Sequence, residues 1–225
     1  MSDELLDRVE VGPSEDASAC VIWLHGLGAD GHDFEPIVPE LGLPPDTVRF
    51  IFPHAPTQPV TLNGGMRMRA WYDLTGIGPD APEDREGIQA NARHIAALID
   101  HEKARGVPAE RMIMAGFSQG GAMALHVGLR HPERLAGMIA LSSYLPSHET
   151  VADEASQANA DTPIFMAHGT GDPVLPFELG TNSRDELERQ GYNVDWYEYP
   201  MQHEVALEEI RALGQWLNRT LGLKG

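Results

Sequence analysis

Hydrophobic positions along the chain fall into two patterns, short continuous runs and longer segments with helical spacing. The runs do not alternate with polar residues, as in CVIWL at residues 20–24, which is typical of strands covered on both faces. They predict strands at residues 20–25, 48–53, 111–117, 135–142, 163–168 and 194–199. Strands separated by helical segments predict an α/β fold, with a mostly parallel central sheet and helices on both faces.

Helical spacing is clearest in two segments, at Ile88, Ala92, Ile95 and Ile99, and at Ala206, Ile210, Leu213 and Leu217. These patterns predict a helix over residues 86–105 and another near the C-terminus, and two further helices are expected over residues 118–130 and 177–190. Residues 55–83 are rich in Gly and Pro and have no clear period. Long unpatterned loops in compact domains are often functional, so we expect this segment to form a wall of a binding site.

Composition says more about the number of domains, the possible partners and the cellular compartment than about the fold. The length of 225 residues suits one hydrophobic core, so we expect a single domain over residues 1–225. The net charge of −18 would repel phosphate-rich partners, which argues against nucleic acid and stable association with anionic membranes. The acidic residues 1–4 and the lack of a long apolar run argue against a secretory signal or membrane span. With Cys20 as the one cysteine, we expect a cytoplasmic protein without disulfides.

The sequence GFSQG at residues 116–120 is the most informative motif. It follows an apolar run and begins a segment with helical character, and this strand–turn–helix setting is that of a nucleophile elbow. The glycines on either side of the serine relieve crowding in such a sharp turn. Ser118 is therefore the predicted nucleophile. The alternative is a serine that caps a glycine-flanked helix.

A serine nucleophile needs a histidine to take its proton and a carboxylate to orient that histidine. In enzymes with this elbow the chain order is serine, then Asp or Glu, then histidine. Asp172 lies in a loop just beyond a predicted strand, where α/β sheets gather functional groups, and His203 is the one histidine that follows it. A turn-forming aspartate and an exposed histidine are the alternatives. We expect the triad Ser118, Asp172 and His203.

The glycine-rich segment WLHGLGAD at residues 23–30 leads out of a predicted strand. Its backbone N–H groups are candidates for an oxyanion hole, together with the N–H of the residue after the nucleophile. The candidate donors are the N–H groups of Leu27 and Gln119. A simple strand-ending turn is the alternative for the first of these.

These motifs together resemble the phospholipase/carboxylesterase family of α/β-hydrolases, which includes carboxylesterases and acyl-protein thioesterases. The matching segments are LHGLGADGHDF at 24–34, FPHAP at 52–56, AWYD at 70–73, GFSQGG at 116–121, HGTGD at 168–172 and residues 199–205. The resemblance implies a compact α/β-hydrolase fold without a large lid that cleaves short to medium acyl esters, and in some relatives fatty thioesters on proteins. It assigns the same triad and the same oxyanion donors. One position departs from the family pattern, because Gln202 replaces the usual glycine before the histidine. That departure implies either a strained backbone at Gln202 or a different loop.

The loop before the elbow supplies candidate substrate contacts. Leu62, Met66 and Trp71 are expected to line an acyl pocket, with Leu175 opposite, because flexible and aromatic side chains suit an apolar ligand. Core packing is the alternative for Trp71.

Three function classes follow from these residues. A carboxylesterase acting on small-molecule esters or thioesters is the first, and an acyl-protein thioesterase or lysophospholipase with the same machinery is the second. A catalytically silent binding protein is the third. Serine chemistry needs no cofactor, and Asp30, His32 and Asp33 lack zinc-type spacing, so no metal is expected. The sequence leaves open whether two copies form a homodimer.

Overall fold

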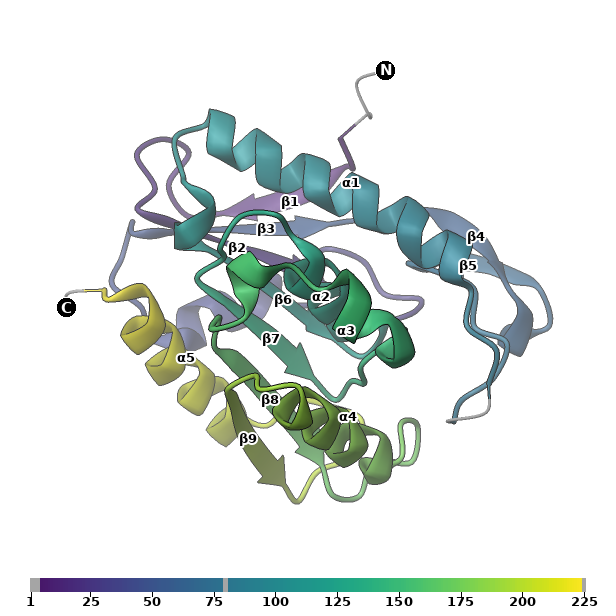
Figure 1. The fold of residues 1–225 in the computed structure, drawn as a ribbon. Coiled ribbons are helices and arrows are strands. Elements are labelled where there is room, and N and C mark those ends of the chain that lie inside the picture. The colour runs from purple at the N-terminus through teal and green to yellow at the C-terminus, as the bar shows by residue number, and fades with distance from the viewer. Residues whose placement is uncertain (1–4, 79–80, 224–225) are drawn as a thin grey trace.

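The computed structural model describes residues 5–78 and 81–223, so the acidic residues 1–4 lie outside the described part. A seven-stranded sheet forms its centre, in the order β1-β3-β2-β6-β7-β8-β9 (Figure 1). Its strands are β1 (Arg8–Val11), β2 (Ala19–Leu24), β3 (Val48–Pro53), β6 (Met112–Phe117), β7 (Gly137–Leu141), β8 (Ile164–Gly169) and β9 (Val194–Tyr199). All neighbouring pairs are parallel except β1 with β3. The predicted α/β fold with a mostly parallel sheet is confirmed.

All six predicted strands are present, two of them with the predicted ends and the others with ends that shift by one or two residues. The sequence pattern missed β1, an antiparallel edge strand only four residues long. It also missed a two-stranded hairpin inside residues 55–83, formed by β4 (Thr57–Val60) and β5 (Met66–Arg69). Figure 1 shows this hairpin beside the N-terminal end of α1, away from the central sheet.

The four predicted helices are confirmed as α1 (Arg85–Ala104), α2 (Gln119–Arg130), α4 (Phe177–Arg189) and α5 (Leu207–Leu221). A short helix, α3 (Val151–Glu154), and a 3-10 helix, η1 (Glu35–Leu41), were not predicted. Helix α1 begins where the carboxylate of Asp84 accepts the backbone N–H of Gly87 at 2.9 Å, which satisfies a donor that the first turn leaves free.

The central strands β2, β3, β6, β7 and β8 are buried on both faces, and successive side chains of β2 show why. Cys20, Ile22 and Leu24 point to one core, whereas Val21 and Trp23 point to the other. The first core is covered by α1, α2 and α4, and the second by α5 and η1. Continuous apolar runs are therefore required here, because no face of a central strand contacts solvent.

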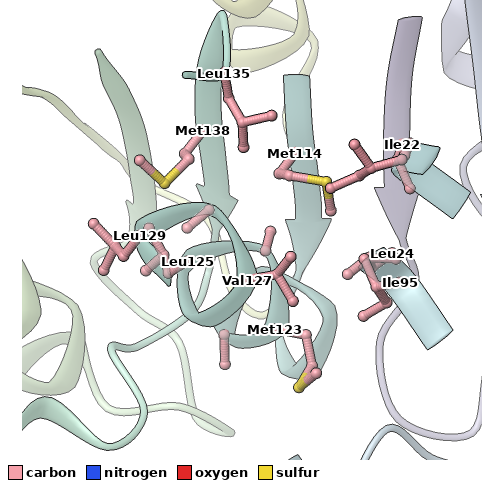
Figure 2. Packing of buried hydrophobic residues seen from close by; sticks show 14 of the residues in the cluster. Ile22, Leu24, Ile95, Met114, Met123, Leu125, Val127, Leu129, Leu135 and Met138 are labelled. Atoms are coloured by element: carbon pink, nitrogen blue, oxygen red, sulfur yellow. The ribbon is translucent and has the colours of Figure 1, made fainter. Parts of the chain in front are cut away.

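Helix α2 packs most closely on the sheet. Figure 2 shows Met123 and Val127 of this helix among Met114, Met138 and Leu24 of the neighbouring strands. A Cβ at Gly128 would lie 2.4 Å from the sulfur of Met138, so a larger residue there would require the Met138 side chain to move. This contact lies near the C-terminal end of α2 and holds that end of the helix close to β7.

In the part of the chain that the structure describes, no helix is both long and apolar enough to cross a membrane. The described residues also contain no inserted lid domain over the carboxyl ends of the strands. The expectation of a single domain over residues 1–225 stays a prediction.

Candidate active site

The turn between β6 and α2 holds Ser118 in an unusual backbone conformation, with φ 54° and ψ −121°. Two glycines make this turn sterically allowed. A Cβ at Gly116 would lie 2.3 Å from the backbone of Gly120, and a Cβ at Gly120 would lie 2.1 Å from the carbonyl oxygen of Leu24. The motif therefore forms a strand–turn–helix elbow in which the serine side chain stands clear of the sheet.

Hydrogen bonds from the next strand hold this strained residue in place. The N–H of Ser118 donates to the carbonyl of Leu141 at 2.9 Å. The hydroxyl of Ser143 donates to the carbonyl of Ser118 at 2.7 Å. A sparsely populated backbone conformation persists only where its surroundings impose it, and both bonds come from the carboxyl end of β7.

The structure brings together the three residues that the sequence selected as a triad. The Oγ of Ser118 lies 3.0 Å from Nε2 of His203, and Nδ1 of His203 lies 2.7 Å from Oδ2 of Asp172. Because the carboxylate accepts from Nδ1–H, Nε2 is left to accept the serine proton. The ring of Phe117 packs against His203 with centroids 4.8 Å apart, which restricts the orientation of the imidazole.

Asp172 is held at both carboxylate oxygens. Its Oδ1 accepts the N–H groups of Val174 and Leu175 at 2.8 and 2.9 Å, which leaves Oδ2 to His203. The sequence analysis did not assign a role to His168, the last histidine before Asp172. Its Nε2–H donates to the carbonyl of Leu175 at 3.0 Å and lies 3.6 Å from Oδ2 of Asp172. Burial lowers the pKa of His168, so the ring is a neutral donor that fixes the turn around the carboxylate.

The loop before His203 accommodates Gln202 without backbone strain, because Gln202 is not among the residues with positive φ. Of the two alternatives that the departure from glycine implied, the strained backbone is not found, and a different loop stays the prediction. The loop is positioned instead by a close approach of β8, where a Cβ at Gly169 would lie 2.4 Å from the carbonyl oxygen of Gln202. The N–H of Gly171 also donates to the carbonyl of Met201 at 3.1 Å.

Two backbone N–H groups lie free beside Ser118. Leu27 follows β2, and among the described residues its N–H has no hydrogen-bond acceptor. Gln119 is the first residue of α2, so its N–H has no acceptor within the helix. Leu27, Gln119 and Ser118 line the same pocket. The assignment of Leu27 and Gln119 as oxyanion donors stays a prediction, which two free N–H groups in the pocket of Ser118 support.

The side chain of Gln119 ties the elbow to the loop that precedes it in the chain. It accepts the backbone N–H of Trp71 and donates to the carbonyl of Tyr72, each at 2.8 Å. The indole N–H of Trp71 in turn donates to the carbonyl of His25 at 2.9 Å. Residues 71–72 therefore connect the two segments that carry the free N–H groups.

His25 adds a further restraint on the same loop. Its Nε2 accepts the N–H of Ala55 at 3.0 Å, so its Nδ1 carries the proton and donates to the carbonyl of Gly26 at 2.7 Å. Burial lowers the pKa of His25 to about 4, which keeps this tautomer neutral. Sequence reasoning placed His25 in the motif but gave it no role, and the signal available was its position directly before the glycines.

A pocket of about 990 Å³ extends from Ser118. Leu62 and Leu175 line it, as the sequence predicted, with Leu175 buried and Leu62 45% exposed. Met66 and Trp71 do not line it. Met66 is on the exposed edge of the hairpin, and Trp71 is completely buried in the core, as the alternative for that residue had it. The segment expected to form a wall does so, with Tyr72, Leu74 and Ile77 as well as Leu62.

Among the described residues, no cluster of three or more His, Cys, Asp or Glu side chains is placed to hold a metal ion. In the loop at residues 30–33, the carboxylate of Asp30 accepts the N–H of His32, and the imidazole of His32 pairs with Glu35.

The family model described as Phospholipase/Carboxylesterase matches residues 7–221. The chain belongs to the phospholipase/carboxylesterase family. Curated relatives include the acyl-protein thioesterase 1 of Neurospora crassa, 44% identical and covering 91% of this chain and 87% of the relative. The acyl-protein thioesterase 1 of Yarrowia lipolytica is 40% identical over 91% of this chain and 92% of the relative.

Solved structures of family members have the same fold. Acyl-protein thioesterase 2 of Zea mays is 32% identical, with a TM-score of 0.85 over 96% of this chain and 99% of that chain. SOBER1 of Arabidopsis thaliana is 31% identical, with a TM-score of 0.86 over 90% of this chain and 99% of that chain. As a member of the phospholipase/carboxylesterase family, the protein has the α/β-hydrolase fold and is an ester or thioester hydrolase.

Proposed function

We propose that the protein hydrolyses carboxylic esters of short to medium acyl chains through an acyl-enzyme intermediate on Ser118. The observation that carries this proposal is the continuous hydrogen-bonded series Ser118–His203–Asp172, with distances of 3.0 and 2.7 Å, at the mouth of a pocket of about 990 Å³. Triads of this geometry perform acyl transfer on several unrelated folds.

In the first half-reaction, the Oγ of Ser118 attacks the substrate carbonyl while Nε2 of His203 takes the hydroxyl proton. The carbonyl oxygen becomes an oxyanion that accepts hydrogen bonds from the N–H groups of Leu27 and Gln119. Asp172 stabilises the imidazolium that forms. When the tetrahedral intermediate collapses, His203 gives its proton to the leaving alkoxide or thiolate, and the acyl group stays on Ser118.

In the second half-reaction, His203 takes a proton from water, and the resulting hydroxide equivalent attacks the acyl carbonyl. Collapse of this second intermediate releases the carboxylic acid and returns the proton to Ser118. No cofactor enters either half-reaction, since every proton and electron pair belongs to the triad, the water or the substrate.

The two halves of the substrate are expected on opposite sides of Ser118. His203 packs on Phe117, which contacts the core on the α5 side of the sheet, whereas Tyr72 belongs to the core on the α1 side. The leaving group must lie near His203 to receive its proton. The acyl chain is therefore assigned to the α1 side, where Tyr72 lines the pocket, and Leu62 and Leu175 line the same pocket.

The test is the rate of hydrolysis of p-nitrophenyl esters from acetate to palmitate by the wild type and by Ser118→Ala. We expect turnover that is greatest for short to medium acyl chains and falls by at least about a thousandfold in the variant. Equal rates for the two proteins would overturn the proposal, and an optimum at palmitate would overturn the assignment of acyl length.

Thioesterase activity on acylated proteins is the second candidate, and the names of the relatives from N. crassa and Y. lipolytica favour it. The side chains of Leu62, Ile77 and Val174 at the pocket are each more than 40% exposed, so an apolar surface continues outward from the site. The kcat/KM for an S-octanoyl peptide compared with an octanoyl ester decides between them. A clear preference for the peptide thioester would favour this second function.

A further inference from the structure

A pair of tyrosines in the pocket wall, Tyr72 buried and Tyr144 partly buried, has no role in the reaction above. The hydroxyls of Tyr72 and Tyr144 lie 2.6 Å apart, and both side chains line the pocket that contains Ser118. Tyr72 is 2% exposed. Removing a hydroxyl from water costs free energy unless it finds a hydrogen-bond partner.

The pair satisfies only one of its two donors. Each tyrosine carries one O–H proton, and the hydrogen bond between the hydroxyls uses one of the two. Among the described residues, neither hydroxyl has a second partner within hydrogen-bond distance. One O–H group therefore remains able to donate to a molecule in the pocket.

Both hydroxyls keep their protons at neutral pH. Burial raises the pKa of Tyr72 well above its usual value and that of Tyr144 to about 12. The nearby carboxylate of Glu83 raises both pKa values further. The pair is thus a hydrogen-bond donor to the ligand, and neither hydroxyl is a base.

The tyrosines are also held in fixed positions relative to the nucleophile. The carbonyl of Tyr72 accepts from the side chain of Gln119, the residue after Ser118. Tyr144 directly follows Ser143, whose hydroxyl donates to the carbonyl of Ser118. A donor fixed at both ends to the elbow can distinguish ligands by the position of a single acceptor.

The negative charge of Glu83 determines which kind of oxygen acceptor a ligand can carry near the tyrosine pair. Glu83 lines the same pocket, and its carboxylate accepts from the N–H and the hydroxyl of Ser147. The negative charge of Glu83 would repel a carboxylate or phosphate on the acyl chain. A neutral carbonyl, ether or hydroxyl oxygen carries no charge to be repelled.

We propose that the Tyr72–Tyr144 pair is a specificity site that selects acyl groups carrying a neutral oxygen acceptor along the chain. This inference rests on the proposed function, because it assumes that the acyl chain occupies the α1 side of the pocket. A hydrogen bond to a neutral acceptor in a buried site contributes roughly 1 kcal/mol, so the preference over the plain acyl chain should be about fivefold to tenfold.

The experiment compares p-nitrophenyl alkanoates of five to nine carbons with analogues of the same length that carry one oxo group, moved from carbon 4 outward. Each kcat/KM ratio of oxo ester to plain ester is divided by the ratio for hydroxide-catalysed hydrolysis, which removes intrinsic reactivity. For the wild type we expect a corrected ratio of about fivefold to tenfold at one oxo position, and near unity elsewhere.

The decisive variant is the double substitution Tyr72→Phe with Tyr144→Phe, since either single variant leaves a hydroxyl that still donates. It should lower the corrected ratio of oxo ester to plain ester to near unity, and because both esters are measured on the same enzyme, a change in the rate on plain esters does not alter this readout. Tyr192→Phe, a buried tyrosine outside the pocket, is the matched control and should keep the wild-type ratio.

A corrected ratio near unity at every position in the wild type would overturn the inference, as would a preference that survives the double substitution. In both cases hydrolysis of the plain esters would leave the proposed function standing. Absence of turnover of any ester would overturn the proposed function itself, and this inference with it.

Discussion

The indole N–H of Trp71 donates a hydrogen bond of 2.9 Å to the backbone carbonyl of His25, 46 residues earlier in the chain. His25 lies at the end of β2, two residues before Leu27, and the backbone N–H of Trp71 is bonded to the side chain of Gln119. A single tryptophan thus sets the spacing between the segments that carry the two proposed oxyanion donors. The buried position of Trp71 therefore holds these two segments of the active site at a fixed separation.

Trp71→Phe should therefore lower kcat more than it raises KM. The substitution removes the indole donor, leaves the carbonyl of His25 without its partner and lets the Leu27 loop move relative to Gln119. Because oxyanion contacts matter most in the transition state, we expect kcat to fall on the order of tenfold to a hundredfold. Steady-state kinetics on a short-chain ester measure the change.

Trp216→Phe is the matched control, because that buried indole donates to Asp195 on β9, away from the pocket. It should keep wild-type kcat. A Trp71→Phe enzyme with wild-type kcat would show that the bond to His25 does not position the site.

Leu62→Arg should shift the acyl-length profile toward shorter chains. Leu62 lines the pocket, and a longer charged side chain there would shorten the apolar space open to an acyl group. We expect kcat/KM for octanoate to fall on the order of tenfold relative to acetate. Met66→Arg places the same charge on the same hairpin outside the pocket, so its profile should match that of the wild type. An unchanged profile in Leu62→Arg would remove Leu62 from the acyl site.

Glu209 should make the folded state less stable as the pH rises. It lies in the first turn of α5, completely buried, where it accepts the N–H of Ala206 at 3.1 Å. Burial raises the pKa of this carboxyl from 4.5 to about 8. The folded state therefore holds a proton that the unfolded state has released, and the stability that depends on it is lost between about pH 4.5 and pH 8.

Glu209→Gln removes this titration while keeping an oxygen that accepts the N–H of Ala206. We would measure urea unfolding of both proteins from pH 5 to 8. The unfolding free energy of the variant should rise relative to that of the wild type as the pH rises, by on the order of 3 kcal/mol at pH 8. A difference that is constant across this range would show that Glu209 is ionised in the folded protein.

The buried ion pair between Arg49 and Glu102 should matter for stability and leave catalysis unchanged. Nη1 of Arg49 lies 2.6 Å from Oε2 of Glu102, and both side chains are 1% exposed. Arg49→Met leaves a buried carboxylate that has lost its main partner, which should cost about 3–5 kcal/mol of unfolding free energy. Lys103→Met breaks the exposed surface pair with Glu133, which solvent screens, and should leave the unfolding free energy close to that of the wild type. Similar losses in both variants would contradict the assignment.

The sequence predicted the central strands and long helices because burial on both faces imposes continuous apolar runs, and amphipathic helices repeat every three to four residues. It missed β1 because four residues with one exposed face carry little pattern. The β4–β5 hairpin was missed because Pro59 interrupts one strand and Met66 is exposed on the other. Such edge elements are stabilised by their neighbours more than by their own composition.

The candidate triad was predictable because residue type, chain order and position after a strand all restricted the choice to Ser118, Asp172 and His203. The residues that hold this site in place could not be predicted from the sequence. Trp71 has the kind of aromatic side chain expected in an apolar pocket. Only the fold shows that its indole N–H donates to a backbone carbonyl. The pairing of Tyr72 with Tyr144 joins residues 72 positions apart, which no local pattern records.

The most direct measurement of the central claim is peptide mass spectrometry after treatment of the folded protein with a fluorophosphonate. Such a probe labels a serine only when a neighbouring base activates it. We expect one stoichiometric adduct on Ser118, abolished in Ser118→Ala and retained in Ser183→Ala, which removes another serine of the pocket. A protein that stays unlabelled, or carries its adduct on a different serine, would contradict the assignment of Ser118 as the nucleophile.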